Sequence, residues 1–324
     1  MGAFYISVSA GGDGRVPIDV AGGVMMNIQR LLTDIGRCSV KRMLSLQGDV
    51  PKEMLFRFTL YINDSQSTIS SSADMKFEGP ESLLNEALAD LFSLLERVSG
   101  GSFDEALAIY NDPRCRTSIQ NDLRSLLDGL GDFVLNYSAD GKEGSFSAAG
   151  ADPGRGDECI FLGDAIGILR GSEGEMFLEM DEGSVPLEYE GDLPADKPCV
   201  INGRLFLSDE GEIEKVAEVR AAEGLPCLSF DRIISVDKDL ALRSPIVADI
   251  DYDKERKLWI LSNTPLGISL SKERLDDAIL EFHDHIVFMW EVYDESSNDG
   301  SEDDFSEDEM QLREYILSVV KDDR

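Results

Sequence analysis

Along the first 149 residues, apolar and polar positions alternate in some stretches, and apolar residues recur at helical spacing in others. The order of these stretches is typical of a domain with both strands and helices. Strand-like alternation appears in three stretches, residues 4–8, 55–62 and 133–137. Apolar residues return every three or four positions in four stretches, residues 24–40, 81–98, 103–110 and 118–130. The order strand, helix, strand, three helices, strand predicts an α+β domain over residues 1–149.

The pattern changes after a linker at residues 150–158, which is rich in Gly, Pro and charge. Short strand patterns then follow one another about every 8–12 residues up to residue 236, separated by turn sequences. This spacing predicts a small β-barrel or sandwich over residues 159–243, similar in layout to OB or SH3-like barrels. The stretch lacks the basic groove and stacking aromatics of a nucleic-acid binder, which favours a structural or adaptor barrel.

Residues 244–324 carry the last unit that the pattern predicts. Three strands are expected at residues 246–252, 258–261 and 266–270, followed by a helix over residues 272–293. An acidic loop is then expected over residues 294–309, and a short closing helix over residues 310–320.

Specific residues in this last unit resemble the HicB-like antitoxin domain of archaea and bacteria. They are Ile246–Asp253 with its Tyr-Asp ending, Leu258-Trp259-Ile260, Leu266-Gly267-Ile268, and a helix that begins Leu275-Asp276-Asp277-Ala278. The resemblance implies a β-β-β-α fold that masks a toxin or binds another protein. The usual DNA-binding helix-turn-helix or ribbon-helix-helix is missing from the sequence pattern. Residues Asn27–Leu32 resemble other prokaryotic proteins, but this implies no activity.

The net charge of −34 narrows the choice of partner. Nucleic acids and anionic membrane surfaces would be repelled, because binding to both draws on Lys and Arg. A basic protein would be attracted and its approach steered. The alternative is that a dense carboxylate surface serves only solubility in a salty cytoplasm.

Cysteines and apolar runs bear on the cellular compartment. The five cysteines are an odd number without a CxxC pair, which predicts reduced thiols in a cytoplasmic protein. Apolar runs are far shorter than the roughly 20 residues of a membrane-spanning helix, and residues 1–10 lack the features of a signal peptide.

The motifs that would carry catalysis or hold a cofactor are weak in this sequence. His283 and His285, the only histidines, stand two apart in a predicted helix and are expected to face different sides, as surface or interface imidazoles. The loop Gly11–Gly14 lacks the remainder of a phosphate-binding motif. Asp249 and Asp251 share one face of a strand, where a solvated surface is favoured over a metal site. No catalytic residue, cofactor or metal is therefore predicted.

The sequence thus favours a non-enzymatic protein-binding protein, antitoxin-like or defence-associated, with a basic protein as its partner. Three alternatives stay open: a self-assembling homo-oligomer, an inhibitor that mimics nucleic acid, and a metal-dependent nuclease or hydrolase using Asp249 and Asp251. The predicted partner-binding residues are the acids of the loop: Asp294, Glu295, Asp299, Glu302, Asp303, Asp304, Glu307, Asp308 and Glu309.

Overall fold

The chain divides into two compact units. Unit 1 comprises residues 1–39 and 55–159, and unit 2 comprises residues 40–54 and 160–324. The computed structural model describes residues 5–10, 16–48, 50–51, 57–63, 71–78, 81–101, 103–107, 109–110, 112–139, 142–149, 160–172, 175–189, 191, 195–208, 211–235, 238–297, 312 and 315–319.

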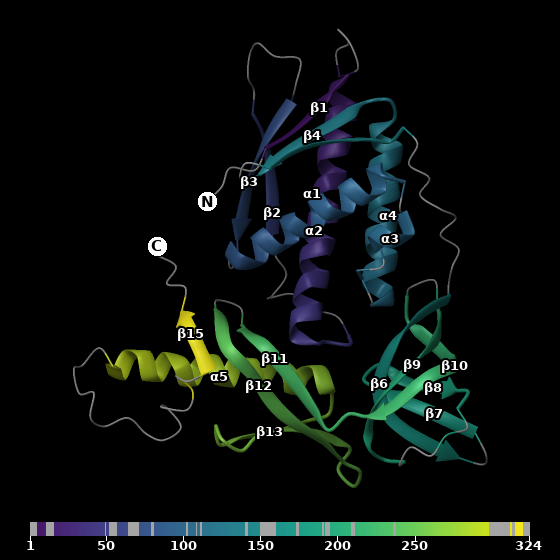
Figure 1. Cartoon of the computed structure of the whole chain (residues 1–324), viewed down its shortest axis with the longest axis vertical. Helices are drawn as coiled ribbons and strands as arrows, with labels where there is room; N and C mark the ends of the chain where they lie inside the picture. Colours follow the sequence, from purple (N-terminus) through teal and green to yellow (C-terminus); the bar gives the residue numbers. More distant parts are fainter. Residues whose placement is uncertain are drawn as a thin grey trace. The chain divides into compact units, whose positions relative to one another are not determined.

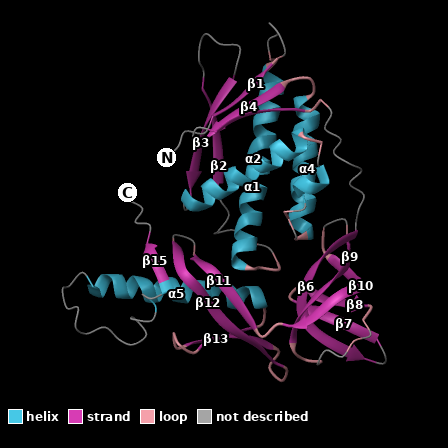
Figure 2. Ribbon diagram, viewed as in Figure 1, coloured by secondary structure: helices cyan, strands magenta, loops and turns pink. Residues whose placement is uncertain are grey.

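A five-stranded antiparallel sheet forms one part of unit 1, with the strand order β2-β3-β1-β4-β5 (Figures 1 and 2). Its strands are β1 (Tyr5–Ser9), β2 (Arg57–Asn63), β3 (Ser71–Glu78), β4 (Val134–Ala139) and β5 (Lys142–Ser147). Alternate residues such as Ile6, Val8 and Leu135 are buried, because successive side chains of a strand point to opposite faces.

Helices supply the rest of the unit 1 core. They are α1 (Ile18–Leu44), α2 (Glu81–Ser99), α3 (Phe103–Leu107) and α4 (Pro113–Leu130). The aromatic rings of Phe92 on α2 and Tyr137 on β4 are stacked, with centroids 4.8 Å apart. Helix α4 begins earlier than predicted, because Asp112 caps it by accepting the Cys115 N–H and Pro113 suits the first turn.

Unit 2 contains a closed five-stranded barrel in the order β10-β8-β7-β6-β9. The strands are β6 (Ile160–Ser172), β7 (Glu175–Met180), β8 (Gly183–Leu187), β9 (Pro198–Leu207) and β10 (Ile213–Gly224). Inward-facing aliphatic residues such as Leu178, Ile201 and Val216 fill the barrel. Gly167 is required where β6 meets β7, since a Cβ there would lie 2.6 Å from the carbonyl oxygen of Glu179.

An antiparallel sheet, called the C-terminal sheet below, completes unit 2 together with one helix. Its strands are β11 (Cys227–Ile234), β12 (Asp239–Asp253), β13 (Leu258–Asn263), β14 (Ile268–Lys272) and β15 (Ile316–Val319). Helix α5 (Leu275–Ser297) packs on one face of this sheet, and the rings of Phe230 and Phe282 meet there at 5.6 Å. The predicted α+β class is therefore confirmed, and the predicted small barrel or sandwich is a closed barrel that ends at Gly224.

One buried carboxylate joins α5 to a turn that is distant in the sequence. Asp276 is 2% exposed and accepts the backbone N–H groups of Gln47 at 2.8 Å and Gly48 at 2.5 Å. The N–H groups of Leu275 and Asp276 donate in turn to Asp181, which lies between β7 and β8. The first turn of α5 thus holds three separate stretches of unit 2 together, because helix N-termini carry free donors and favour anions.

Several predicted boundaries differ from the structure. The apolar pattern does not predict β3 and β5, because their sequences are polar and their strand conformation is imposed by pairing with neighbours. Helix α5 continues to Ser297, so Asp294 and Glu295 are helical and not part of a loop. The predicted closing helix is wrong over Ile316–Val319, which pairs with β12 as a strand. The C-terminal sheet begins at Cys227, so residue 244 falls inside β12.

Candidate functional site

A groove of about 690 Å³ lies on the face of the C-terminal sheet opposite α5. Strand β12 alternates buried and exposed residues, so Ile250 points toward the core while Asp249 and Asp251 point away from α5. Their cross-strand partners on β13, Ser262 and Ile260, line the same groove. A regular strand pair therefore presents two carboxylates two residues apart.

One wall of the groove comes from the start of β9 and from the two residues that link the barrel to this sheet. Pro198, Leu225 and Pro226 line it and give it an apolar surface. The Leu225 N–H donates to the Pro198 carbonyl, and the Ile250 N–H donates to the Pro226 carbonyl, each at 2.9 Å. Because backbone hydrogen bonds hold both ends of Leu225–Pro226, the wall is fixed relative to β12.

The two carboxylates of the groove differ in their partners. Asp251 accepts the Lys197 ammonium at 2.8 Å and the Tyr252 N–H at 2.8 Å. The bond from Lys197, and then that from Tyr252, hold the pKa of Asp251 below its usual range. Asp249 is exposed and has no ion-pair partner among the residues that the structure describes. One carboxylate thus already carries a cation, and the other is open to one.

A charged network lies close to this ion pair. Arg170 binds Glu179 and Asp196, and its guanidinium lies 5.4 Å from the ring centroid of Tyr252. Lys254 binds the same Asp196. Hydrogen bonds from Lys254 and Arg170 lower the pKa of Asp196, so this carboxylate is kept ionised. The network connects the barrel to the β12–β13 turn.

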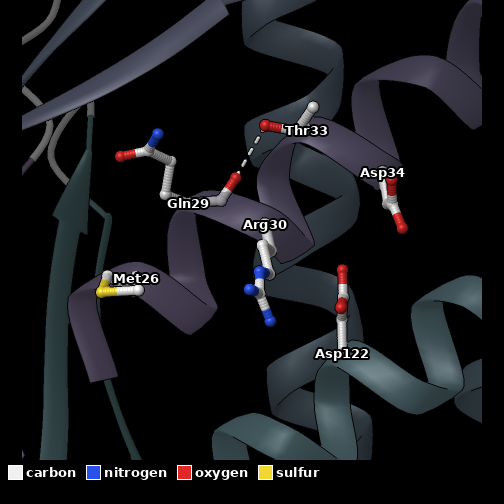
Figure 3. Close-up of a pocket in the computed structure, with 6 residues that line it drawn as sticks. All are labelled: Met26, Gln29, Arg30, Thr33, Asp34 and Asp122. Atoms are coloured by element: carbon white, nitrogen blue, oxygen red, sulfur yellow. Dashed lines mark hydrogen bonds between the residues drawn. The ribbon is translucent and has the colours of Figure 1, made fainter. Parts of the chain in front are cut away.

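A second cavity, of about 390 Å³, lies in unit 1 between α1 and α4 (Figure 3). Asp34 on α1 and Asp122 on α4 line it together with Arg30. Asp34 also accepts the hydroxyl of Ser118, and Arg37 binds both Ser118 and Asp34.

One of the two carboxyl groups in this second cavity, that of Asp122, has a raised pKa. Burial first, then the negative charge of Asp34 and a hydrogen bond with it, raise the pKa of Asp122 to about 6. Arg30 and Arg37 act in the opposite direction. Asp122 therefore keeps its proton into mildly acidic solution, which relieves its repulsion from Asp34 across the contact between α1 and α4.

Asp122→Asn should stabilise unit 1 at pH 8 and have little effect at pH 4. A raised carboxyl pKa contributes stability that is present below about pH 4 and is lost as the pH rises through about 6. Asparagine removes the repulsion and can donate to Asp34, but solvent screening at this half-exposed site limits the gain to under about 1 kcal/mol. Urea unfolding at both pH values measures it. An equal gain from Asp128→Asn, an exposed site on α4, would contradict the pairing.

A disulfide joins Cys38 on α1 to Cys115 on α4, with their Cα atoms 5.6 Å apart. The prediction of reduced thiols is therefore wrong for these two cysteines. Residues 77 positions apart meet because the two helices run antiparallel, as the bond from Asn27 to Ser125 also shows. Cys199 and Cys227 are free thiols, whereas Cys159 lies outside the described residues.

The two histidines lie in different environments, as their spacing predicts. His283 is fully buried, and its Nδ1 accepts the Ile234 N–H at 3.1 Å. His285 is exposed. The prediction of a surface or interface imidazole is thus wrong for His283, because its ring lies in the core, 4.7 Å from the ring of Phe230.

Several predicted sites fall outside the described residues. These are the Gly11–Gly14 loop and the acids Asp299, Glu302, Asp303, Asp304, Glu307, Asp308 and Glu309. The side chains of Asp294 and Glu295 are likewise not described. Within the described ranges, Asp249 and Asp251 belong to no group of three or more side chains suited to a metal ion. None of the described helices is long and apolar enough to cross a membrane.

Asp249 and Asp251 are recognisable in the sequence, but the residues that surround them are not. Lys197 and Leu225 lie far from β12 in the sequence, and no motif connects them to it. Asp34 and Asp122 are missed for the same reason, although both lie on predicted helices.

Comparison with known proteins adds no family to this picture. No protein-family model matches the chain, and no curated protein or solved structure matches it. The HicB-like resemblance therefore stays a prediction, and the features that bear on function are the groove and the charge of the chain.

Proposed function

We propose that this chain is a non-enzymatic protein-binding protein that captures a basic protein partner. The observation that carries the proposal is the open face of the C-terminal sheet. Helix α5 covers the opposite face, and the open face presents Asp249 and Asp251 beside the exposed Val247. A mixed acidic and apolar surface on a rigid, helix-backed sheet suits a partner with basic and aliphatic side chains.

The charge of the whole chain supports the same partner class. A net charge of −34 creates a field that concentrates cationic proteins near the surface and disfavours nucleic acid. The antitoxin-like role is a finer proposal. It is supported by the order β12, β13, β14 and α5, which is the β-β-β-α order that the resemblance implies. In such a role the partner would be a small basic toxin.

Salt should slow capture of the partner if charge steers its approach. The experiment captures binding proteins on the immobilised full chain from an extract of the source organism, identifies them by mass spectrometry and purifies the most basic one. Its association rate constant should fall about tenfold or more between 0.01 M and 0.15 M salt, because the Debye length shortens from about 30 Å to about 8 Å. The dissociation rate should change less.

Two variants locate the steering charge. One carries Asn or Gln in place of the nine acids predicted between residues 294 and 309, and the other carries Asp249→Asn with Asp251→Asn. The Asp249 and Asp251 variant should retain the melting temperature, because both residues are exposed and exposed charges contribute little to folding. The melting temperature of the nine-acid variant is measured as its control. If the association rate constant does not change with salt or in either variant, the charge serves only solubility and the proposal is wrong.

A further inference from the structure

The groove beside β12 differs from the rest of the acidic surface in shape and lining. It is an open groove, and its volume of about 690 Å³ lies within the range of ligand-binding clefts, about 300–1,000 Å³. Pro198, Leu225, Pro226 and Ile260 give it apolar surface, and Asp249 and Asp251 give it negative charge. An inorganic cation would use only the charge, whereas a lysine or arginine side chain would use both.

Lys197 shows how a cationic side chain is accommodated there. Its ammonium lies 2.8 Å from Asp251, and both side chains remain more than half exposed, at 56% and 57%. Such an exposed ion pair is weak and exchanges readily. Asp249, on the same strand face, has no such partner among the described residues. The groove therefore holds one vacant carboxylate and one that the protein's own lysine occupies.

We propose that this groove binds an extended, lysine- or arginine-bearing segment of the partner protein. One cationic group pairs with Asp249, and its aliphatic stem lies on Leu225 and Pro226, because long basic side chains bury their methylene groups while the charge stays in water. A second cation competes with Lys197 for Asp251. The inference rests on the proposed function and assigns it a site.

The spacing of the two carboxylates favours an extended segment. Asp249 and Asp251 are two residues apart on one strand face, which separates their Cα atoms by roughly 6.5–7 Å. An extended peptide repeats its side chains on one side at the same interval. Alternating basic residues of the partner would therefore match the two carboxylates one to one, and a helical segment would not.

The test uses the full-length chain and a defined probe, an eight-residue capped peptide of alternating lysine and alanine, with a glutamate–alanine peptide as the negative control. Dissociation constants are measured by calorimetry at 0.01 M salt. Asp249→Asn should weaken binding of the lysine peptide about fivefold. Asp231→Asn, an exposed acid on β11 outside the groove, should change it less than twofold.

Two further pairs of variants test the lysine and the apolar surface. Lys197→Ala should tighten binding about threefold by freeing Asp251, whereas Lys215→Ala, which breaks an ion pair with Glu188 on the barrel, should not. Leu225→Ser should weaken binding several-fold, and Leu162→Ser, at an exposed leucine of β6, should not.

The outcomes separate this inference from the proposed function. Equal losses from Asp249→Asn and Asp231→Asn would mean that cations bind anywhere on the surface, which overturns the groove and leaves the function standing. A chain that captures a basic protein but not the lysine peptide overturns the groove in the same way. Failure to bind either one overturns both.

Discussion

Asp276→Ala should lower the free energy of unfolding of unit 2 by about 3 kcal/mol, with a fall of roughly 10 °C in melting temperature. The substitution leaves the Gln47 and Gly48 N–H groups without their acceptor at a site that is 2% exposed. Part of the loss is offset, because burial raises the pKa of Asp276 to about 6 and its ionised form is therefore costly at neutral pH. Thermal and urea unfolding at pH 7 measure the change.

Matched variants separate the hydrogen bonds that Asp276 accepts from the effect of an acidic residue in the first turn of a helix. Asp277→Ala removes an exposed carboxylate from the same first turn and should cost less than about 1 kcal/mol. Asp276→Asn should fall between the two, because an amide retains one acceptor oxygen. Gly48→Ala should also destabilise, since its Cβ would lie 2.8 Å from an Asp276 carboxylate oxygen. Equal costs for Asp276→Ala and Asp277→Ala would refute the role of the buried carboxylate.

Acid should destabilise unit 2 through His283, by a few kcal/mol between pH 6.5 and about pH 3. Burial lowers the pKa of His283 from 6.5 to about 3, so the unfolded chain binds a proton in this range and the folded chain does not. A depressed pKa contributes stability that is present above pH 6.5 and is lost as the pH falls toward 3. Urea midpoints measured at half-unit steps of pH would show the slope.

The hydrogen bond of His283 also requires a neutral ring. Its Nδ1 accepts the Ile234 N–H, so the proton is placed on Nε2, which has no hydrogen-bond partner among the described residues. A protonated ring would lose that acceptor and would place a buried charge beside the ring of Phe230.

His283→Asn tests the assignment, because its amide oxygen can replace Nδ1 while the residue no longer titrates. This variant should be less stable at pH 7, because the core loses the volume of the ring. Its free energy of unfolding should not show the fall with decreasing pH that is due to His283. Asp276 titrates with the opposite sign, because its raised pKa adds stability on acidification. Asp276→Asn should therefore steepen the acid loss, and an unchanged slope in His283→Asn would exclude the histidine as its source.

The regular elements of this protein are largely predictable from its amino-acid pattern. Apolar spacing predicts residues 81–98 and 4–8 within a residue of α2 and β1, because the spacing in each segment matches one regular structure. The barrel follows from the regular spacing of short strands. The surplus of carboxylates favours basic partners on composition alone.

Contacts between residues that are distant in the sequence depend on how the elements pack. Strand β3 has a polar sequence and exists because β1 and β2 hydrogen-bond to it from both sides. Cys38 reaches Cys115, Asp34 reaches Asp122, and Lys197 reaches Asp251, each across more than fifty residues. Local spacing reports the period of one segment and holds no information on the register between segments. Helix packing and strand pairing set that register, and with it the groove and the contact between Asp34 and Asp122.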